Sequence, residues 1–168
     1  MSTRPFDPER ALETLVRHRV RFVVIGGFAA RLFGSPTLTN DLDICFARDA
    51  KNLAALSAAL LELKATLRGA PAGLPFRPDV PKLTAGDHFT LATIAGNLDC
   101  IGTPAGTGGF ADLIAGAAEI SIGKLRIPIV ALEDLIRMKE AAVRPKDRVE
   151  LEILAALKEE IERGESDR

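Results

Sequence analysis

Two aspartates that alternate with apolar residues, Asp41 and Asp43, are the side chains in this sequence best suited to chemistry. On a strand, residues i and i+2 point to the same face, with Cβ atoms roughly 6 to 7 Å apart. At that separation two carboxylates can share one or two Mg²⁺ ions, because magnesium prefers oxygen ligands. Asp99, between Leu98 and Cys100, has the same apolar setting and is a candidate third acid. The pattern predicts a site that holds two Mg²⁺ ions for phosphoryl or nucleotidyl transfer.

A glycine pair, Gly26-Gly27, follows a run of apolar residues, and thirteen residues separate it from Asp41. Glycine at a turn between a strand and a helix lets the backbone approach a phosphate closely. The pair is therefore a candidate contact for nucleotide phosphates.

Lys139 has an unusual place on the helix expected from about Leu132 to Val143. At about 100° per residue, it falls near the centre of an apolar arc made by Leu132, Leu135, Ile136, Ala142 and Val143. A lysine on an inward face is costly unless its ammonium meets an anion or water. Two explanations are open: an internal ion pair or snorkelling at the helix edge, or an ammonium that reaches the carboxylates' face and holds a triphosphate.

The sequence resembles the polymerase β-type nucleotidyltransferase superfamily in four features: the Gly-Gly pair, the thirteen-residue gap, the Asp-x-Asp motif and the later apolar-Asp-apolar triplet. The segments Gly-Gly-Phe-Ala-Ala-Arg-Leu-Phe-Gly and Thr-Asn-Asp-Leu-Asp-Ile are similar to those of small bacterial nucleotidyltransferases, including toxin–antitoxin and abortive-infection proteins. The resemblance spans about residues 20 to 150.

The resemblance implies transfer of a nucleoside monophosphate from a nucleoside triphosphate to an acceptor hydroxyl, with Mg²⁺ as cofactor and pyrophosphate as product. The implied residues are the metal-binding and catalytic Asp41, Asp43 and Asp99, and the nucleotide-binding Gly26, Gly27, Thr39 and Lys139. The acceptor is open among an RNA end, a protein side chain and a small molecule.

The sequence departs from the family at Thr37, where small members often have an arginine two residues before the motif's threonine. Triphosphate contact is then weaker or supplied by Arg31. The extra helical domain with which larger relatives hold an acceptor is missing, and a partner protein or a homodimer could provide it. One alternative is a nucleotide-binding or toxin–antitoxin interaction module that has lost turnover. Another, a metal-dependent phosphohydrolase, fits the spacing less well.

Composition indicates one globular domain without membrane segments. The 168 residues are 47% hydrophobic and 27% charged with a net charge of -1, which excludes general disorder and nonspecific binding of long nucleic acid. Cys45 and Cys100 are too few for a disulfide framework and are expected to be packed, as in a reducing cytoplasm. His18 and His88 are expected to have surface or structural roles.

The positions of apolar, glycine and proline residues predict an α/β or α+β fold, with a small mixed sheet flanked by helices. Residues about 20 to 130 form the core and about 131 to 163 the C-terminal helices. The expected strands are 20–25, 41–46, 88–94, 98–101, 119–122 and 125–130, with the third and fourth paired as a hairpin. The expected helices are 8–19, 28–33, 53–67, 110–115, 132–143 and 146–163, with a loop at 70–81 and a frayed tail at 164–168.

Overall fold

A computed structural model describes residues 5–71, 74–142 and 145–166. The helices are α1 (Pro8–Arg17), α2 (Gly26–Leu32), α3 (Ala50–Glu62), α4 (Val80–Ala85), α5 (Phe110–Gly116), α6 (Leu132–Ala142) and α7 (Pro145–Ser166). The strands are β1 (Phe22–Ile25), β2 (Asp41–Phe46), β3 (Thr66–Leu67), β4 (His88–Thr93), β5 (Gly96–Ile101), β6 (Ala118–Ile122) and β7 (Leu125–Ile129).

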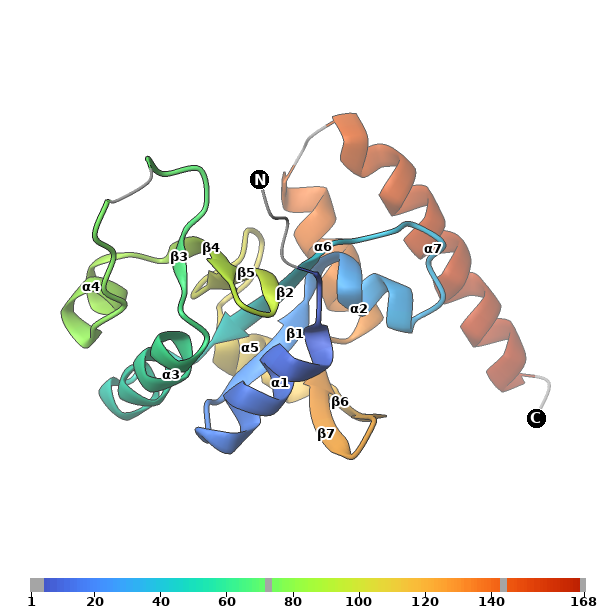
Figure 1. Ribbon diagram of the computed structural model, residues 1–168. Coiled ribbons are helices and arrows are strands. Elements are labelled where there is room, and N and C mark those ends of the chain that lie inside the picture. Colours follow the sequence, from blue (N-terminus) through green and yellow to red (C-terminus); the bar gives the residue numbers. More distant parts are fainter. Residues whose placement is uncertain (1–4, 72–73, 143–144, 167–168) are drawn as a thin grey trace.

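The strands form one seven-stranded sheet in the order β3-β4-β5-β2-β1-β7-β6. The sheet is mixed, since β1 pairs with β7 and β2 with β5 in parallel while the other neighbours are antiparallel. Figure 1 shows α1 and α3 in front of this sheet, α5 behind it, and α6 and α7 together at one side with α2 between them and the strands. The expected mixed sheet flanked by helices is confirmed, including the β4–β5 hairpin.

The core lies between the sheet and the helices that cover it. Leu42 and Ile44 of β2 are fully buried, as are Leu53 and Leu56 of α3. The alternation of β2 sends these apolar side chains to one face and the acids to the other, which leaves the acids half-buried. Among the described residues, no helix combines the length and the apolar character that crossing a membrane requires.

The register of the sheet places residues from four strands, and Arg68 just after a fifth, in one row. Ile25 of β1 pairs with Asp43 of β2, which pairs with Asp99 of β5. Asp99 pairs with Thr90 of β4, and the backbone N–H of Arg68, just after β3, donates to the Thr90 carbonyl at 3.0 Å. Side chains at paired positions lie on the same face of a sheet. The row therefore gathers two acids and an arginine from distant parts of the chain on one surface.

The expected helix over 53–67 is wrong at its end, because α3 stops at Glu62 and Leu67 belongs to the edge strand β3. Lys64 adopts a left-handed conformation with φ 53°, and the N–H of Ala65 donates to the carbonyl of Leu60 at 3.0 Å. This closes the helix in the manner usual for glycine, which the sequence lacks there. Gly69 consequently terminates a strand region rather than a helix.

The expected loop at 70–81 ends earlier than predicted, and its residues 72–73 lie outside the described residues. The short helix α4 begins at Val80, with the Asp79 carboxylate accepting a hydrogen bond from the Lys82 N–H at 3.0 Å. Pro81 occupies the first turn, where a missing N–H costs nothing. These are ordinary helix-start signals that the proline-rich surroundings obscured.

The long helix α7 buries only part of the predicted stripe, since Leu157 packs against the core but both ends of the stripe are exposed. The expected stripe was Val149, Ile153, Leu157 and Ile161, but Val149 is 63% and Ile161 is 42% exposed, whereas Leu154 is fully buried. The helix also continues through Gly164 to Ser166, so the expected frayed tail is wrong for its first residues. Residues 167–168 of that tail lie outside the described residues, as does Val143 of the expected arc on α6.

Replacing Leu154 by alanine should lower the free energy of unfolding by about 2 to 5 kcal/mol, because it opens a cavity in the core. Ile161→Ala removes a partly exposed side chain from the same helix and should cost about 1 kcal/mol or less. Urea denaturation of both variants measures the difference. A larger loss for Ile161→Ala would restore the predicted stripe as the buried face.

Candidate active site

The three predicted acids come together on one face of the sheet. Asp43 and Asp99 are direct partners across the parallel pair β2–β5, and Asp41 pairs with Asn97 in the same ladder. The Asn97 amide donates to Asp41 Oδ1 at 3.1 Å, which fixes that carboxylate at the edge of the group. Asp41 is the most exposed of the three, with 42% of its side chain accessible, against 18% for Asp99.

Asp43 is the most confined acid, because its strand passes close to Gly26. Gly26 has φ +71°, and a Cβ at that position would overlap the Asp43 carboxyl. Burial, then the charges of Asp99 and Asp41, raise the pKa of Asp43 to about 7, while Lys139 and Arg68 oppose this shift. Among the described residues, Asp43 Oδ1 is one of the few buried side-chain atoms without a hydrogen-bond partner. An acid in this state is poised to accept a cation.

Arg68 supplies a positive charge that the sequence did not predict. Its guanidinium donates to Asp99 Oδ1 at 2.7 Å and lies 3.9 Å from Asp41 Oδ1. It also donates to the carbonyl of Leu91 on β4 at 3.3 Å. Two of the three acids thus face an arginine.

The side chains at this face can be compared with the oxygen ligands that magnesium prefers. Within the described part of the chain, no three histidine, cysteine, aspartate or glutamate side chains are gathered closely enough to hold a metal ion. The chemistry of the donors nevertheless fits, because three carboxylates share one face and the buried Asp43 Oδ1 has no partner. Asp41, Asp43 and Asp99 are the residues that would bind it.

The glycine pair begins α2 rather than only ending β1, so this helix starts two residues earlier than predicted. A Cβ at Gly27 would come within 3.3 Å of Thr39, whose hydroxyl donates to the Asp41 carbonyl at 3.2 Å. Thr39 therefore packs between the glycine turn and the start of β2. This contact sets the distance between the backbone at Gly26 and the acids.

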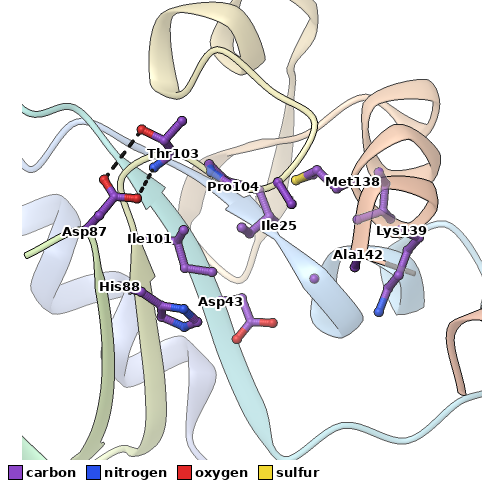
Figure 2. Close-up of a pocket in the computed structure, with 13 residues that line it drawn as sticks. Ile25, Asp43, Asp87, His88, Ile101, Thr103, Pro104, Met138, Lys139 and Ala142 are labelled. Carbon is purple, nitrogen blue, oxygen red and sulfur yellow. Dashed lines mark hydrogen bonds between the residues drawn. The ribbon is translucent and has the colours of Figure 1, made fainter. Parts of the chain in front are cut away.

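A cavity of about 320 Å³ opens between the acidic face and α6. Figure 2 shows Asp43 facing it from β2, with His88 on one side and Lys139 of α6 on the other. Most of its remaining lining is apolar: Ile25, Ile101, Pro104, Ala105, Leu135, Met138 and Ala142. Gly26 also lines it, so three of the predicted residues, Gly26, Asp43 and Lys139, share one cavity.

Lys139 is half-buried, lines the cavity and lowers the pKa of Asp43 through its charge. An internal ion pair and a contact with a triphosphate both stay predictions for its ammonium. Buried neighbours on α6 are Leu132, Leu135 and Met138. A lysine stem on this face contributes apolar contact while its charge serves the cavity.

One side of the cavity is built around Asp87, an acid that sequence reasoning missed. Asp87 accepts hydrogen bonds from the Thr103 backbone N–H at 3.0 Å and from Arg48 at 3.1 Å. These bonds tie the start of β4 to the loop after β5 and hold His88 at the mouth of the cavity. The expected surface or structural role of His88 has to be widened accordingly, because it lines the cavity that holds Asp43.

The other residues singled out in the sequence lie outside the lining of the cavity. Thr37 donates to Glu150 of α7 at 3.0 Å, so this departure from the family pattern fastens the loop before β2 to the last helix. Arg31 is exposed in the last turn of α2. Cys45 and Cys100 are buried, as expected, and burial raises the pKa of the Cys45 thiol to about 12. His18 contacts Glu62 at 3.1 Å, and it is not among the residues that line the cavity.

No protein-family model and no curated protein matches the sequence, but solved structures match the fold. The chain is similar to the lincosamide antibiotic adenylyltransferase LnuA, solved with lincomycin bound, with 17% identity, a TM-score of 0.58, and 89% of this chain and 95% of that chain covered. It is also similar to ANT(2″)-Ia in complex with adenylyl-2″-tobramycin, with 17% identity, a TM-score of 0.55, and 89% and 86% covered.

A third similar structure is a Thermotoga maritima protein described as a nucleotidyltransferase, with 16% identity, a TM-score of 0.54, and 92% of this chain and 96% of that chain covered. These likenesses define the class: the chain has the nucleotidyltransferase fold, as the resemblance in its sequence implied. The acidic face described above lies on that fold.

Asp43→Asn should make the metal-free protein more stable at pH 8, by on the order of 2 kcal/mol. The pKa of Asp43 is about 7 in the folded protein and near 4 when unfolded, so the unfolded chain loses its proton first as pH rises. Folding stability therefore falls between about pH 4 and pH 7 in the wild type, and this fall should vanish in the variant.

Thermal unfolding in EDTA across pH 4 to 8 measures this dependence. Asp41→Asn is the matched control, since it leaves Asp43 in place and should keep most of the wild-type pH profile. If the Asp43→Asn variant is less stable than the wild type at pH 8, the negative charge of Asp43 does not destabilise the fold and the prediction is wrong.

Proposed function

We propose that the protein is a Mg²⁺-dependent nucleotidyltransferase that moves a nucleoside monophosphate from a nucleoside triphosphate to an acceptor hydroxyl. The observation that carries this proposal is the pairing of Asp43 with Asp99 across β2 and β5. Asp41 lies two residues before Asp43 on the same strand, and Gly26 packs against Asp43. Three acids beside a glycine turn and an apolar cavity suit a substrate that combines phosphates with a nucleoside.

The residues around the cavity divide the work. The apolar walls and His88 accommodate the nucleoside, while the backbone at Gly26 and Gly27 approaches the phosphates, with Thr39 fixing that turn. Lys139 offers a point charge to the triphosphate. The acceptor oxygen attacks the α-phosphorus as the bond to pyrophosphate breaks, and Asp99 takes the hydroxyl proton.

Asp41, Asp43 and Asp99 would hold the magnesium ions, which neutralise phosphate charge and lower the pKa of the attacking hydroxyl. The raised pKa of Asp43 supports this role, because a divalent cation favours the charged form that burial disfavours.

For the acceptor, we favour a hydroxyl of a small molecule over an RNA end or a protein side chain. Two of the matching structures are antibiotic adenylyltransferases, and one of them holds an adenylyl-tobramycin product. The net charge of -1 also gives no general attraction for RNA.

Further parts of the proposal concern surroundings. The chain acts as one domain in the cytoplasm, in keeping with its two buried free cysteines. A partner protein or a second copy completes the acceptor side, and a toxin–antitoxin setting is one context in which a partner would be present. The alternative is a nucleotide-binding module that has the same fold but no catalytic turnover. The transfer experiment below distinguishes it from the enzyme.

Incubation with each α-labelled nucleoside triphosphate, Mg²⁺ and separate pools of small hydroxyl compounds, RNA or protein should label the small-molecule pool. Asp43→Asn and Asp99→Asn should each reduce labelling by about 100-fold or more, because each removes a charged metal ligand. Asp7→Asn makes the same substitution at the N-cap of α1, where asparagine caps equally well, and should retain activity.

Nucleotide binding without label transfer to any pool would identify the binding module instead. Labelling that survives in all three variants Asp41→Asn, Asp43→Asn and Asp99→Asn would overturn the site. Label that appears in RNA or protein would keep the enzyme and correct the acceptor.

Lys139→Met should weaken binding of a nucleoside triphosphate by about 10-fold while the melting temperature of the free protein stays nearly unchanged. Methionine preserves the apolar stem that this residue extends from α6 and removes only the charge. Lys124→Met, on the exposed β6–β7 turn, is the control and should leave both properties unaltered. A large loss of stability with unchanged affinity would assign Lys139 to a structural ion pair.

A further inference from the structure

Arg68 is placed at the acidic face by the sheet and not by chance of rotamer. It follows the two-residue strand β3, and its backbone N–H continues the β3–β4 ladder by donating to Thr90. Thr90 is the ladder partner of Asp99, so Arg68 stands two strands from that acid on the same row. An arginine side chain is long enough to reach back across β4, and this one does.

The contacts of the guanidinium show how it is held at the acidic face. It is hydrogen-bonded to Asp99 at 2.7 Å and to the Leu91 carbonyl at 3.3 Å, and it lies 3.9 Å from Asp41. Its side chain is 28% exposed, so the ion pair is partly shielded from water and is stronger than a surface pair. Arg68 thereby offsets repulsion among acids that the register forces together.

The same contacts conflict with the binding of divalent cations. The carboxylate of Asp99 that accepts from Arg68 is one of the three that would hold a cation, and the carboxylate of Asp41 lies within ion-pair distance of the same guanidinium. Magnesium would also replace the negative charge that attracts the guanidinium with positive charge.

We propose that Arg68 is a built-in counter-ion of the catalytic acids, a positioning residue that a divalent cation must displace from Asp99 before the site is competent. The guanidinium and the cation then compete for the same oxygens, and Arg68 lowers the affinity of the nucleotide-free protein for metal. The inference rests on the proposed function, because it takes these acids to be metal ligands.

A purely structural role for Arg68 predicts something different. If the guanidinium only fastened the edge strand β3 to β4, its removal would loosen the fold and leave metal affinity unchanged or weaker. Competition predicts that the same removal tightens metal binding. The sign of the change in affinity therefore separates the two roles.

The experiment is titration of Mn²⁺ into the full chain without nucleotide, with free Mn²⁺ followed by its electron paramagnetic resonance signal. Arg68→Gln should bind Mn²⁺ about 10-fold more tightly than the wild type, since a charge-assisted hydrogen bond of this kind contributes on that order. Arg68→Lys keeps a charge without the fork and should fall between them. Arg126→Gln breaks the exposed pair with Glu119, whose residues do not line the cavity, and should bind as the wild type does.

Melting temperature supplies a second readout, which is informative even where Arg68→Gln folds poorly. In EDTA this variant should melt below the wild type because its acids are uncompensated, and Mn²⁺ should raise its melting temperature by more than that of the wild type. Equal or weaker Mn²⁺ binding by Arg68→Gln overturns the counter-ion role while leaving the proposed function intact. Mn²⁺ binding that is missing in every variant, or unaffected by Asp43→Asn, overturns the metal site and the counter-ion role with it.

Discussion

Carboxylates on neighbouring strands repel one another, and the parallel register of β2 and β5 sets Asp43 directly beside Asp99. Strands in a sheet lie about 4.8 Å apart, so this repulsion cannot be avoided by moving the backbone. Burial makes it worse for Asp43, whose pKa rises to about 7. Much of the surrounding structure can be understood as the means by which a folded chain tolerates these charges.

The compensation comes from each side of the acids. Arg68 contacts Asp99 from the β3 edge, and Asn97 donates to Asp41 from β5. Lys139 acts on Asp43 from α6, across the cavity. Only Asp43 keeps a buried oxygen without a partner among the described residues, which leaves its negative charge least satisfied. A protein selected for stability alone would have little reason to retain an acid in that position.

Local patterns were sufficient to predict what depends on neighbours in the sequence. The alternation from Asp41 to Phe46 predicted β2 with its observed bounds, and the glycine between two apolar runs predicted the β4–β5 hairpin. The apolar arc on α6 similarly predicted a lysine on an inward face, and Lys139 is half-buried there. In each case the period of apolar residues determines the side that a residue faces.

Features that depend on pairing between distant segments were not predictable in the same way. Arg68 was hidden because leucines at helical spacing extended a helix through Leu67, and no glycine marked the turn at Lys64. The stripe predicted on α7 was right only in part, because an apolar stripe does not say which neighbours cover it. Leu157 packs against the core, but Leu154, outside the stripe, is the fully buried residue. Asp87 and His88 became part of the cavity only through the loop that follows β5.

The cavity has walls from both ends of the chain: Gly26 precedes Lys139 by more than a hundred residues, and α3, β3, α4 and β4 lie between β2 and β5 in the sequence. Contacts of such long sequence separation form late in folding, because the entropy of closing the intervening chain must first be overcome. During synthesis, the acids of β2 exist before their partners on β5, and the cavity has no second wall until α6 has emerged. Any ligand of this cavity would therefore be bound by the finished fold and not by a nascent chain, so its binding would report on completed folding.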